Sequence, residues 1–546
     1  MTLIRSLTES RYLAIAALLC GLLCIVSFSA VTQEQGRIDE RPQAAPAATP
    51  LRVLTWHNDN PRTGQNLNET ILTLGNVNTT QFGKKFILPV DGWVSAQPLY
   101  FSNVSVPGQG THNIVYVATE NDSVYAFDAN GVPATPLWHR QFTDPAGGIT
   151  AVPCADTPSC NLSPVLGITS TPVIDASTGT LYVVAFTDEN GEYFQRLHAL
   201  NIATGAEKFG GPVAIQASVN GTGTGSVGGK ITFDPLIQLQ RAALLLSNGV
   251  VYISWGSFAD LENYHGWIMG YSASTLAQVG LFSDTRNGAE GGIWLSGGGP
   301  STGPDGSIFV QTGNGTFDAN TSGADFGDSF LRFSPKTGLS MVADYFTPTN
   351  QATLRSGDID LGSGAALILP GQSGSFTYEL IGAGKQGIIY VVNQQNMGKF
   401  NATKNNVIQT VTGSAAGYRG SPAYFNNAVY YSGVSDFLTR YTLTSGLLSA
   451  TPVSESPTKF NIGSTPSVSA NGTTNGIVWA IDKGVGTNAA VLHAYDASNV
   501  SHELYHSDQN VSRDNLGQGI TFSVPTVANG KVYIGTKSNV VVYGLL

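Results

Sequence analysis

Short runs in which hydrophobic and polar positions alternate recur along most of the chain, and glycine, proline, serine or aspartate commonly bounds them. Alternation with a period of two predicts β-strands, and the enrichment of these runs in valine, isoleucine and tyrosine supports that prediction. Each repeating unit starts with a small or proline-containing segment, continues through an apolar strand, and commonly ends in a strand close to aspartate. The apolar strands are predicted at residues 115–119, 181–184, 250–253, 308–310, 388–391, 429–431, 477–480 and 532–535.

Eight copies of one unit indicate radial repetition of four-stranded blades. The sequence therefore predicts an all-β protein, a β-propeller of eight four-stranded blades in a single domain over residues 51–546, with seven blades as the alternative. The chain ends in a further strand, residues 540–545, and residues 85–94 are also strand-like. We expect the early segment to complete the last blade, because closing the ring removes exposed sheet edges.

Residues 1–30 are typical of an export signal. Arg5 and Arg11 precede an apolar run over residues 12–28, and small residues surround a cleavage point after Ser29. This pattern predicts a secreted or periplasmic protein. An uncleaved N-terminal membrane anchor is the alternative, because the run is close to the shortest length that spans a bilayer.

Residues 31–50 are polar and rich in alanine and proline, which predicts a linker between the signal and the propeller. Cys154 and Cys160 stand close together in a proline-rich stretch. Because an exported protein folds in an oxidising compartment, this pair predicts a local disulfide.

Composition and charge exclude several classes of function. Only 12% of residues are charged and 64 of 546 are glycine, which argues against a disordered chain or a coiled coil. A net charge of −10 without a basic cluster makes nucleic acid an unsuitable partner. The string from His502 to His506 matches the zincin motif, but it falls where the repeat predicts a strand, whereas that chemistry needs a helix.

Four residues with useful chemistry each stand within two positions of a glycine, at the start or end of a strand-like run, within residues 288–393. They are Trp294, Asn314, Asp360 and Lys385. Glycine beside such a side chain lets backbone or ligand approach closely. This stretch is therefore the candidate functional region.

In their order and approximate spacing these residues resemble the quinoprotein alcohol dehydrogenases, which bind pyrroloquinoline quinone (PQQ) and calcium on an eight-bladed propeller. The repeats resemble the PQQ-type repeat over nearly the whole of residues 51–546. The run over residues 56–64 resembles the N-terminal segment of that family, and we expect it to pack the start of the chain against the ring. The resemblance implies PQQ contacts from Trp294 and Lys385, calcium ligation by Glu262, Asn314 and Asp360, and a catalytic base at Asp360.

The chemistry of that family needs these residue types. An aspartate base takes the hydroxyl proton of the substrate as hydride moves to the quinone. Calcium, held by oxygen ligands, polarises the quinone carbonyl. A cation stabilises the negative charge of the reduced quinone, and a tryptophan face stacks on the planar cofactor.

The chain also departs from the family pattern. The adjacent cysteine pair of the family has no equivalent, because Cys154 and Cys160 are not adjacent. Ser334 stands in place of an aspartate, Ile359 in place of a tryptophan, and His265 in place of an arginine. Glu262 is one position out of register.

Two functions from different classes follow from the sequence. The first is an oxidoreductase that oxidises a small alcohol or sugar with PQQ and calcium. It would pass electrons to a separate acceptor, because the chain has no Cys-x-x-Cys-His haem motif. The second is a non-catalytic propeller that acts as a platform for protein partners in the cell envelope. A monomer is expected in either case.

Overall fold

The computed structural model describes residues 51–546 apart from residues 161, 414–416 and 487. The predicted export signal and linker lie outside the described residues. None of the helices in the described part has the length and apolarity that crossing a membrane requires.

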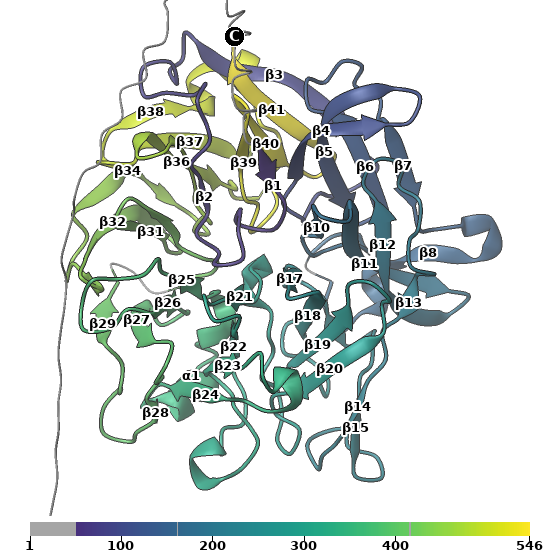
Figure 1. Cartoon of the computed structure of the whole chain (residues 1–546), viewed down its shortest axis with the longest axis vertical. Helices are drawn as coiled ribbons and strands as arrows, with labels where there is room; N and C mark the ends of the chain where they lie inside the picture. Colours follow the sequence, from purple (N-terminus) through teal and green to yellow (C-terminus); the bar gives the residue numbers. More distant parts are fainter. Residues whose placement is uncertain (1–50, 161, 414–416, 487) are drawn as a thin grey trace, which may run out of the picture. The chain divides into compact units, whose positions relative to one another are not determined.

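The strands form eight blades around a central axis, as the sequence predicts (Figure 1). The first blade holds β1 (Arg52–Val53), β4 (Leu99–Val106), β5 (Gly110–Thr119), β6 (Ser123–Asp128) and β7 (Trp138–Gln141). The second holds β10 (Val173–Asp175), β11 (Thr180–Glu189), β12 (Glu192–Asn201) and β13 (Val213–Ala214), extended by β8 (Ile149–Pro153) and β9 (Val165–Leu166). The third holds β17 (Leu245–Ser247), β18 (Val250–Ser257), β19 (Trp267–Ser272) and β20 (Gln278–Ser283), with β16 (Gln238–Leu239) added on β18.

The fourth and fifth blades carry the candidate functional region between them. The fourth holds β21 (Ser301–Thr302), β22 (Ile308–Gln311), β23 (Phe330–Phe333) and β24 (Asp344–Thr347), extended by β28 (Lys399–Phe400). The fifth holds β25 (Leu367–Ile368), β26 (Glu379–Ala383), β27 (Ile388–Asn393) and β29 (Gln409–Thr412).

The last three blades complete the ring. The sixth holds β30 (Ala423–Phe425), β31 (Ala428–Ser432), β32 (Asp436–Thr444) and β34 (Ser454–Phe460), with β33 (Leu447–Leu448). The seventh holds β35 (Ser467–Asn471), β36 (Thr474–Asp482), β37 (Val491–Asp496) and β38 (Glu503–His506), with β2 (Gln65–Asn66) on β35. The eighth holds β39 (Thr526–Ala528), β40 (Lys531–Gly535), β41 (Asn539–Leu545) and β3 (Phe82–Pro89).

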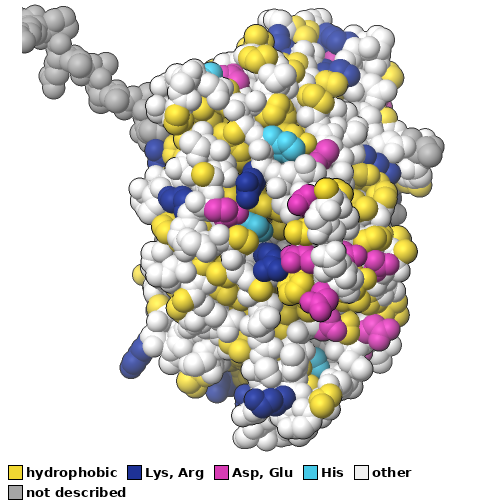
Figure 2. All heavy atoms as spheres, turned by 90° about the vertical axis from the view of Figure 1, so that its right-hand side faces the viewer, with side chains coloured by type: hydrophobic (Ala, Val, Ile, Leu, Met, Phe, Trp, Pro, Cys, Tyr) yellow, Lys and Arg dark blue, Asp and Glu magenta, His cyan; other side chains and the backbone are white. Residues whose placement is uncertain are grey.

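The remaining elements are short. Outside the blades, β14 (Ser218–Asn220) and β15 (Lys230–Thr232) form a two-stranded hairpin. The helices are α1 (Gln351–Ser356), α2 (Val511–Asp514), η1 (Pro145–Gly147), η2 (Cys154–Asp156), η3 (Leu295–Gly297), η4 (Ala319–Thr321), η5 (Gly338–Ser340), η6 (Leu361–Ser363) and η7 (Ser507–Asn510). Few charged side chains lie among the uncharged ones on the side shown in Figure 2, in keeping with the low charged fraction of the chain.

The ring closes as predicted. β3 pairs antiparallel with β41, so a strand from the start of the propeller completes the blade built from its end. The strand begins at Phe82 and ends at Pro89, slightly earlier than the predicted residues 85–94. The strand does not continue beyond Pro89. Instead, the Val90 and Val94 N–H groups donate to carbonyl groups of the β40–β41 turn.

Two further predictions from the sequence are confirmed. Cys154 and Cys160 form a disulfide, with Cα atoms 5.0 Å apart. The string from His502 to His506 lies on β38 and the residue before it, so its two histidines do not share a helix face.

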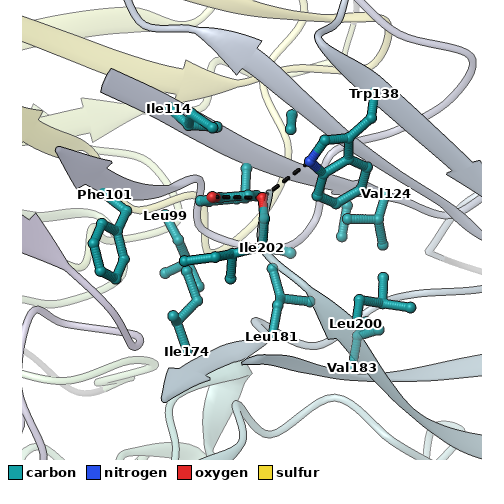
Figure 3. Packing of buried hydrophobic residues seen from close by; sticks show 14 of the residues in the cluster. Leu99, Phe101, Ile114, Val124, Trp138, Ile174, Leu181, Val183, Leu200 and Ile202 are labelled. Carbon is teal, nitrogen blue, oxygen red and sulfur yellow. Dashed lines mark hydrogen bonds between the residues drawn. The ribbon is translucent and has the colours of Figure 1, made fainter. Parts of the chain in front are cut away.

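Apolar side chains of neighbouring blades interdigitate to form the core. Figure 3 shows this packing between the first two blades, where Leu99 and Ile114 face Ile174 and Leu181 across the blade boundary. All four are at most 3% exposed. Burying such side chains supplies roughly 25 cal/mol for each Å² of apolar surface removed from water, which makes the boundaries between blades the main source of stability.

A polar contact recurs at the same boundaries. The hydroxyl of Tyr116 and the indole N–H of Trp138 both donate to the Ile202 carbonyl, at 2.9 and 3.0 Å (Figure 3). The same kind of bond runs from the second strand of a blade to the turn after the third strand of the next blade. Its donors and acceptors are Tyr182 and Ala273, Tyr430 and Ala497, and Tyr533 and Ala129.

Tyr533→Phe tests the bond that joins the last blade to the first. The Tyr533 hydroxyl donates to the Ala129 carbonyl at 3.1 Å and the side chain is fully buried. We expect the free energy of unfolding to fall by about 1–2 kcal/mol, because the substitution removes a buried donor. Urea denaturation measures this, with exposed Tyr378→Phe as the control. Equal midpoints for the two variants would contradict the role of this bond.

A segment near the start of the chain, the axial segment, lies inside the ring and forms hydrogen bonds with all eight blades. Its carbonyl groups accept from N–H groups of the second, fifth, sixth and seventh blades: Leu54 from Ile174, Pro61 from Ile368, Thr63 from Tyr424, and Gly64 from Val468. The His57 N–H and the Asn66 amide reach the first and eighth blades, at Gln97 and Val527. The Arg62 guanidinium donates to carbonyl groups of the third and fourth blades, at Leu244 and Pro300. The predicted packing of residues 56–64 against the ring is confirmed.

Candidate functional site

One cavity gathers the candidate residues. Its volume is about 400 Å³, within the range of about 300–1,000 Å³ that small-molecule sites occupy. Its lining comes from loops of several blades and includes Asp260, Trp294, Asp358, Asp360, Lys385, Arg241, Arg419 and Phe522. Three of the five residues that the sequence predicts, Trp294, Asp360 and Lys385, therefore line a single space.

Asp360 and Lys385 form an ion pair in the wall of this cavity. The Lys385 Nζ lies 2.7 Å from Asp360 Oδ2 and 2.6 Å from Asp358 Oδ1. The Asp360 side chain is 5% exposed, whereas that of Asp358 is 68% exposed. The second oxygen of Asp360 accepts the backbone N–H of Asn314 at 2.8 Å. Asp360 is thus a buried carboxylate whose two oxygens are both held in position.

The surroundings shift the pKa values of this pair. Burial raises the pKa of Asp360 above its ordinary value, even though Lys385 and the Asn314 N–H stabilise the ionised form. Burial lowers the pKa of Lys385, the neighbouring Asp360 and Asp358 carboxylates raise it, and the net shift is upward. A carboxyl with a raised pKa next to a cation is suited to take up and release a proton.

Glycine residues on both sides permit this close arrangement. A Cβ on Gly313 would lie 2.6 Å from Asp360 Oδ1, and a Cβ on Gly384 would lie 2.4 Å from the Asp360 carbonyl. The Lys385 N–H donates to that same carbonyl at 2.9 Å. The glycines next to Asn314 and Lys385 in the sequence are therefore required for the approach of the two segments.

Trp294 lies half-buried at the entry to η3 and lines the cavity. The two residues after it, Leu295 and Ser296, have φ values of 50° and 48°, a left-handed conformation that is rare for side chains of this kind. The Ser296 hydroxyl donates to the Ser363 carbonyl at 2.6 Å, which holds the turn against the segment after Asp360. Strained backbone of this sort is concentrated at functional sites.

Three carboxylates come together at the cavity. Oxygen atoms of Asp260, Asp358 and Asp360 all lie within 4.8 Å of one another. Asp260 is held by hydrogen bonds from the hydroxyls of Tyr264 and Ser257, at 2.6 and 2.9 Å. Clustered carboxylate oxygens are the ligands that calcium and other hard cations prefer.

Asn314 adds an amide to this group. Its side chain Nδ2 donates to Asp358 Oδ1 at 3.0 Å, and the residue is 6% exposed. Its Oδ1 is buried and has no hydrogen-bond partner among the described residues. A buried acceptor without a partner costs roughly 1–3 kcal/mol, and a cation ligated by this oxygen would remove that cost.

Glu262 lies outside the carboxylate group, although the resemblance implied it as a calcium ligand. Glu262 is an exposed loop residue with a φ of 64°, and it is not among the residues that line the cavity. Asp260, two positions earlier in the same loop, points to the other carboxylates instead. Ala259 and Asp260 also have positive φ values, and this backbone path decides which acidic side chain reaches the cavity.

Sequence reasoning missed Asp260 and Asp358. The position of Asp358 two residues before the predicted base Asp360 was a usable signal. Asp260 had a weaker signal, its position shortly after the end of β18. Only the folded loop shows that it approaches the other two.

A further buried carboxyl lies close by without adding charge. Burial raises the pKa of Asp328 to about 8, although the Leu361 N–H donates to it at 3.1 Å. Asp328 is therefore mostly protonated at neutral pH. Asp360 differs from Asp328 in having Lys385 beside it, and this cation favours its ionised form.

Comparison with models of known protein families finds no match, and no curated protein matches the sequence. Solved structures share the fold. The quinohemoprotein alcohol dehydrogenase ADHIIG of Pseudomonas putida HK5 superposes with a TM-score of 0.58 at 13% identity, over 91% of this chain and 80% of its own. The quinohemoprotein alcohol dehydrogenase of Comamonas testosteroni gives 0.57 at 14%, over 90% and 80%. A europium-containing methanol dehydrogenase gives 0.55 at 13%, over 90% and 98%. This chain therefore has the propeller fold of quinoprotein alcohol dehydrogenases.

Proposed function

We propose that the protein is an exported quinoprotein oxidoreductase that oxidises an alcohol or sugar and passes electrons to a separate acceptor. The observation that carries this proposal is the buried, ion-paired Asp360 in the wall of a cavity that also holds Trp294 and the carboxylate group. The fold similarity to quinohemoprotein alcohol dehydrogenases supports it.

The residues present fit the two groups that this function needs. Calcium would be held by Asp260, Asp358, Asp360 and the unpartnered Oδ1 of Asn314. PQQ would lie against the Trp294 face with its oxygens near Lys385. When bound, the quinone supplies the hydride acceptor and calcium supplies Lewis acidity.

The side chains then have distinct tasks. Asp360 accepts the hydroxyl proton of the substrate, and burial keeps bulk water from competing for its oxygens. The Asn314 N–H and the Lys385 ammonium orient the two Asp360 oxygens. Lys385 provides a fixed positive charge beside the place where negative charge develops.

The raised pKa of Asp360 predicts an unusual titration in the calcium-free protein. Burial raises this pKa above the ordinary carboxyl value of about 4. A cation ligated by Asp360 favours the ionised form, so added calcium should lower the midpoint. NMR titration of the carboxyl signals, with Asp360→Asn to assign the signal, measures both midpoints. A calcium-free midpoint at or below about 4 would contradict the effect of burial on Asp360.

The calcium affinity of two variants distinguishes the role of Asp260 from that of Glu262. We expect Asp260→Asn to weaken calcium binding by about tenfold or more, because it removes one of the clustered carboxylates. Glu262→Gln is the matched control, since Glu262 lies in the same loop but outside the group, and its affinity should stay within twofold of wild type. Calorimetry on the quinone-free protein measures both. The reverse order of effects would restore Glu262 as the ligand.

The proposal as a whole is tested by reconstitution of the purified chain with PQQ and calcium. We expect calcium-dependent micromolar or tighter binding of PQQ by calorimetry and dye reduction with a panel of alcohols and sugars. Failure to bind PQQ under these conditions would reject the proposed function.

A non-catalytic envelope platform is the second candidate. One observation favours it: Lys385 already forms ion pairs with both Asp358 and Asp360, so each of these carboxylates has a partner without any bound cation. In that case pull-downs from envelope fractions would recover protein partners, and Asp360→Asn would leave their binding unchanged.

A further inference from the structure

A second, smaller chamber adjoins the main cavity. Its volume is about 110 Å³, and the two spaces share Leu162, Arg241 and Thr521 in their walls. The chamber has roughly a quarter of the volume of the main cavity, and it suits a small group such as a carboxylate, sulfate or phosphate.

The charged side chains in its wall are all cationic. Arg241, Lys483 and Lys537 line the chamber, and its wall contains no aspartate or glutamate. Across the described residues, none of the three has a carboxylate within ion-pair distance, although most other buried or half-buried charges at the site do. The three cations come from three different blades. Arg241 precedes β17 of the third blade, Lys483 follows β36 of the seventh, and Lys537 follows β40 of the eighth.

Arg241 is the most deeply placed of these cations. It is 5% exposed, and its Nη2 donates to the Thr521 carbonyl at 3.2 Å. Its Nε is buried and has no hydrogen-bond partner among the described residues. The neighbouring acid is Glu120, whose oxygens already accept from Ser95, Gly167 and Thr169. A buried guanidinium N–H without an acceptor is a place for an anionic oxygen.

The two lysines complete a basic wall. Lys537 Nζ lies 4.4 Å from the centre of the Trp93 ring, which also lines the chamber. Burial lowers the pKa of Lys483, and the positive charges of Lys537 and Arg241 lower it further. Three cations that repel one another gain when an anion lies between them.

We propose that this chamber binds the acidic group of a ligand whose remaining part occupies the main cavity, so that the ligand is an alcohol or sugar bearing a carboxylate, sulfate or phosphate. The ligand's role as a substrate rests on the proposed oxidoreductase function, whereas its binding does not. The shared wall at Arg241 and Thr521 allows one molecule to reach both spaces.

The test compares matched sugars on the full purified chain. Glucose, glucuronate, glucose 6-sulfate and glucose 6-phosphate are titrated by calorimetry in the absence of quinone. We expect at least one acidic sugar to bind about tenfold or more tightly than glucose, with an advantage that shrinks as salt is raised. The acidic sugar that binds best distinguishes carboxylate, sulfate and phosphate.

Variants assign the effect to the chamber. Lys483→Met with Lys537→Met should remove the preference for the acidic sugar, whereas Lys230→Met with Lys336→Met should keep it, because both of those lysines are exposed and lie outside the wall. Thermal melting confirms that both double variants are folded.

Three results would overturn the proposal. They are equal affinity for glucose and all acidic sugars, equal losses in the two double variants, and a loss of PQQ binding in the chamber variant with the acidic sugar unaffected. The last would assign the chamber to the quinone. Selective acidic-sugar binding without turnover of any sugar would support the chamber and reject the oxidoreductase.

Discussion

Asp360→Asn is expected to lower quinone-dependent kcat by about 10²–10⁴-fold, the contribution that a positioned general base makes. Asparagine has nearly the same shape but cannot accept a proton at neutral pH. The variant should still fold, because the Asn314 N–H can donate to the new amide oxygen as it does to Asp360 Oδ1. Steady-state dye reduction after reconstitution with PQQ and calcium measures the effect.

Asp358→Asn is the matched control for this prediction. Asp358 contacts the same Lys385 Nζ and belongs to the same carboxylate group, but its side chain is largely exposed. We expect a smaller loss of kcat, and one that higher calcium concentrations partly restore. If Asp358→Asn abolished turnover while Asp360→Asn kept it, the base would be Asp358.

Arg62→Met is expected to lower the free energy of unfolding by at least about 3 kcal/mol, because it breaks a buried hydrogen-bond network. Arg62 is fully buried. Its guanidinium donates to the carbonyls of Trp56, Pro300 and Leu244, at 2.8, 2.9 and 3.2 Å. Methionine fills similar space but leaves these buried acceptors without donors.

Urea denaturation measures the loss, and Arg140→Met is the control because Arg140 is exposed on β7. We expect the urea midpoint of Arg140→Met to differ from that of the wild type by no more than an ordinary surface substitution causes. Burial lowers the pKa of Arg62 to about 9, so the guanidinium is charged at neutral pH and its hydrogen bonds are charge-assisted. Similar midpoints for the two variants would show that the axial segment does not hold the blades together.

Local pattern determined the strands, the number of blades and the closure of the ring. Alternation with a period of two depends only on neighbouring residues, so it is visible without the fold. The closing strand was predicted because a closed ring has no exposed sheet edges, and β3 pairs with β41 accordingly. The axial run over residues 56–64 was predicted to pack on the ring, but its bonds to every blade are seen only in the structure.

The sequence also indicated the central part of the site. Trp294, Asp360 and Lys385 stand within two positions of a glycine in a shared region, and they line one cavity. Adjacent glycines reveal where backbones approach closely, as Gly313 and Gly384 do against Asp360.

The tertiary structure alone decided which other charges converge. Asp260 and not Glu262 joins the carboxylates, because positive φ values in its loop redirect the side chains, and no periodicity encodes such a turn. The cations Arg241, Lys483 and Lys537 lie far apart in the chain and meet only because segments of the third, seventh and eighth blades line one chamber. Strands follow from spacing between neighbours, whereas a site between blades depends on where distant loops end.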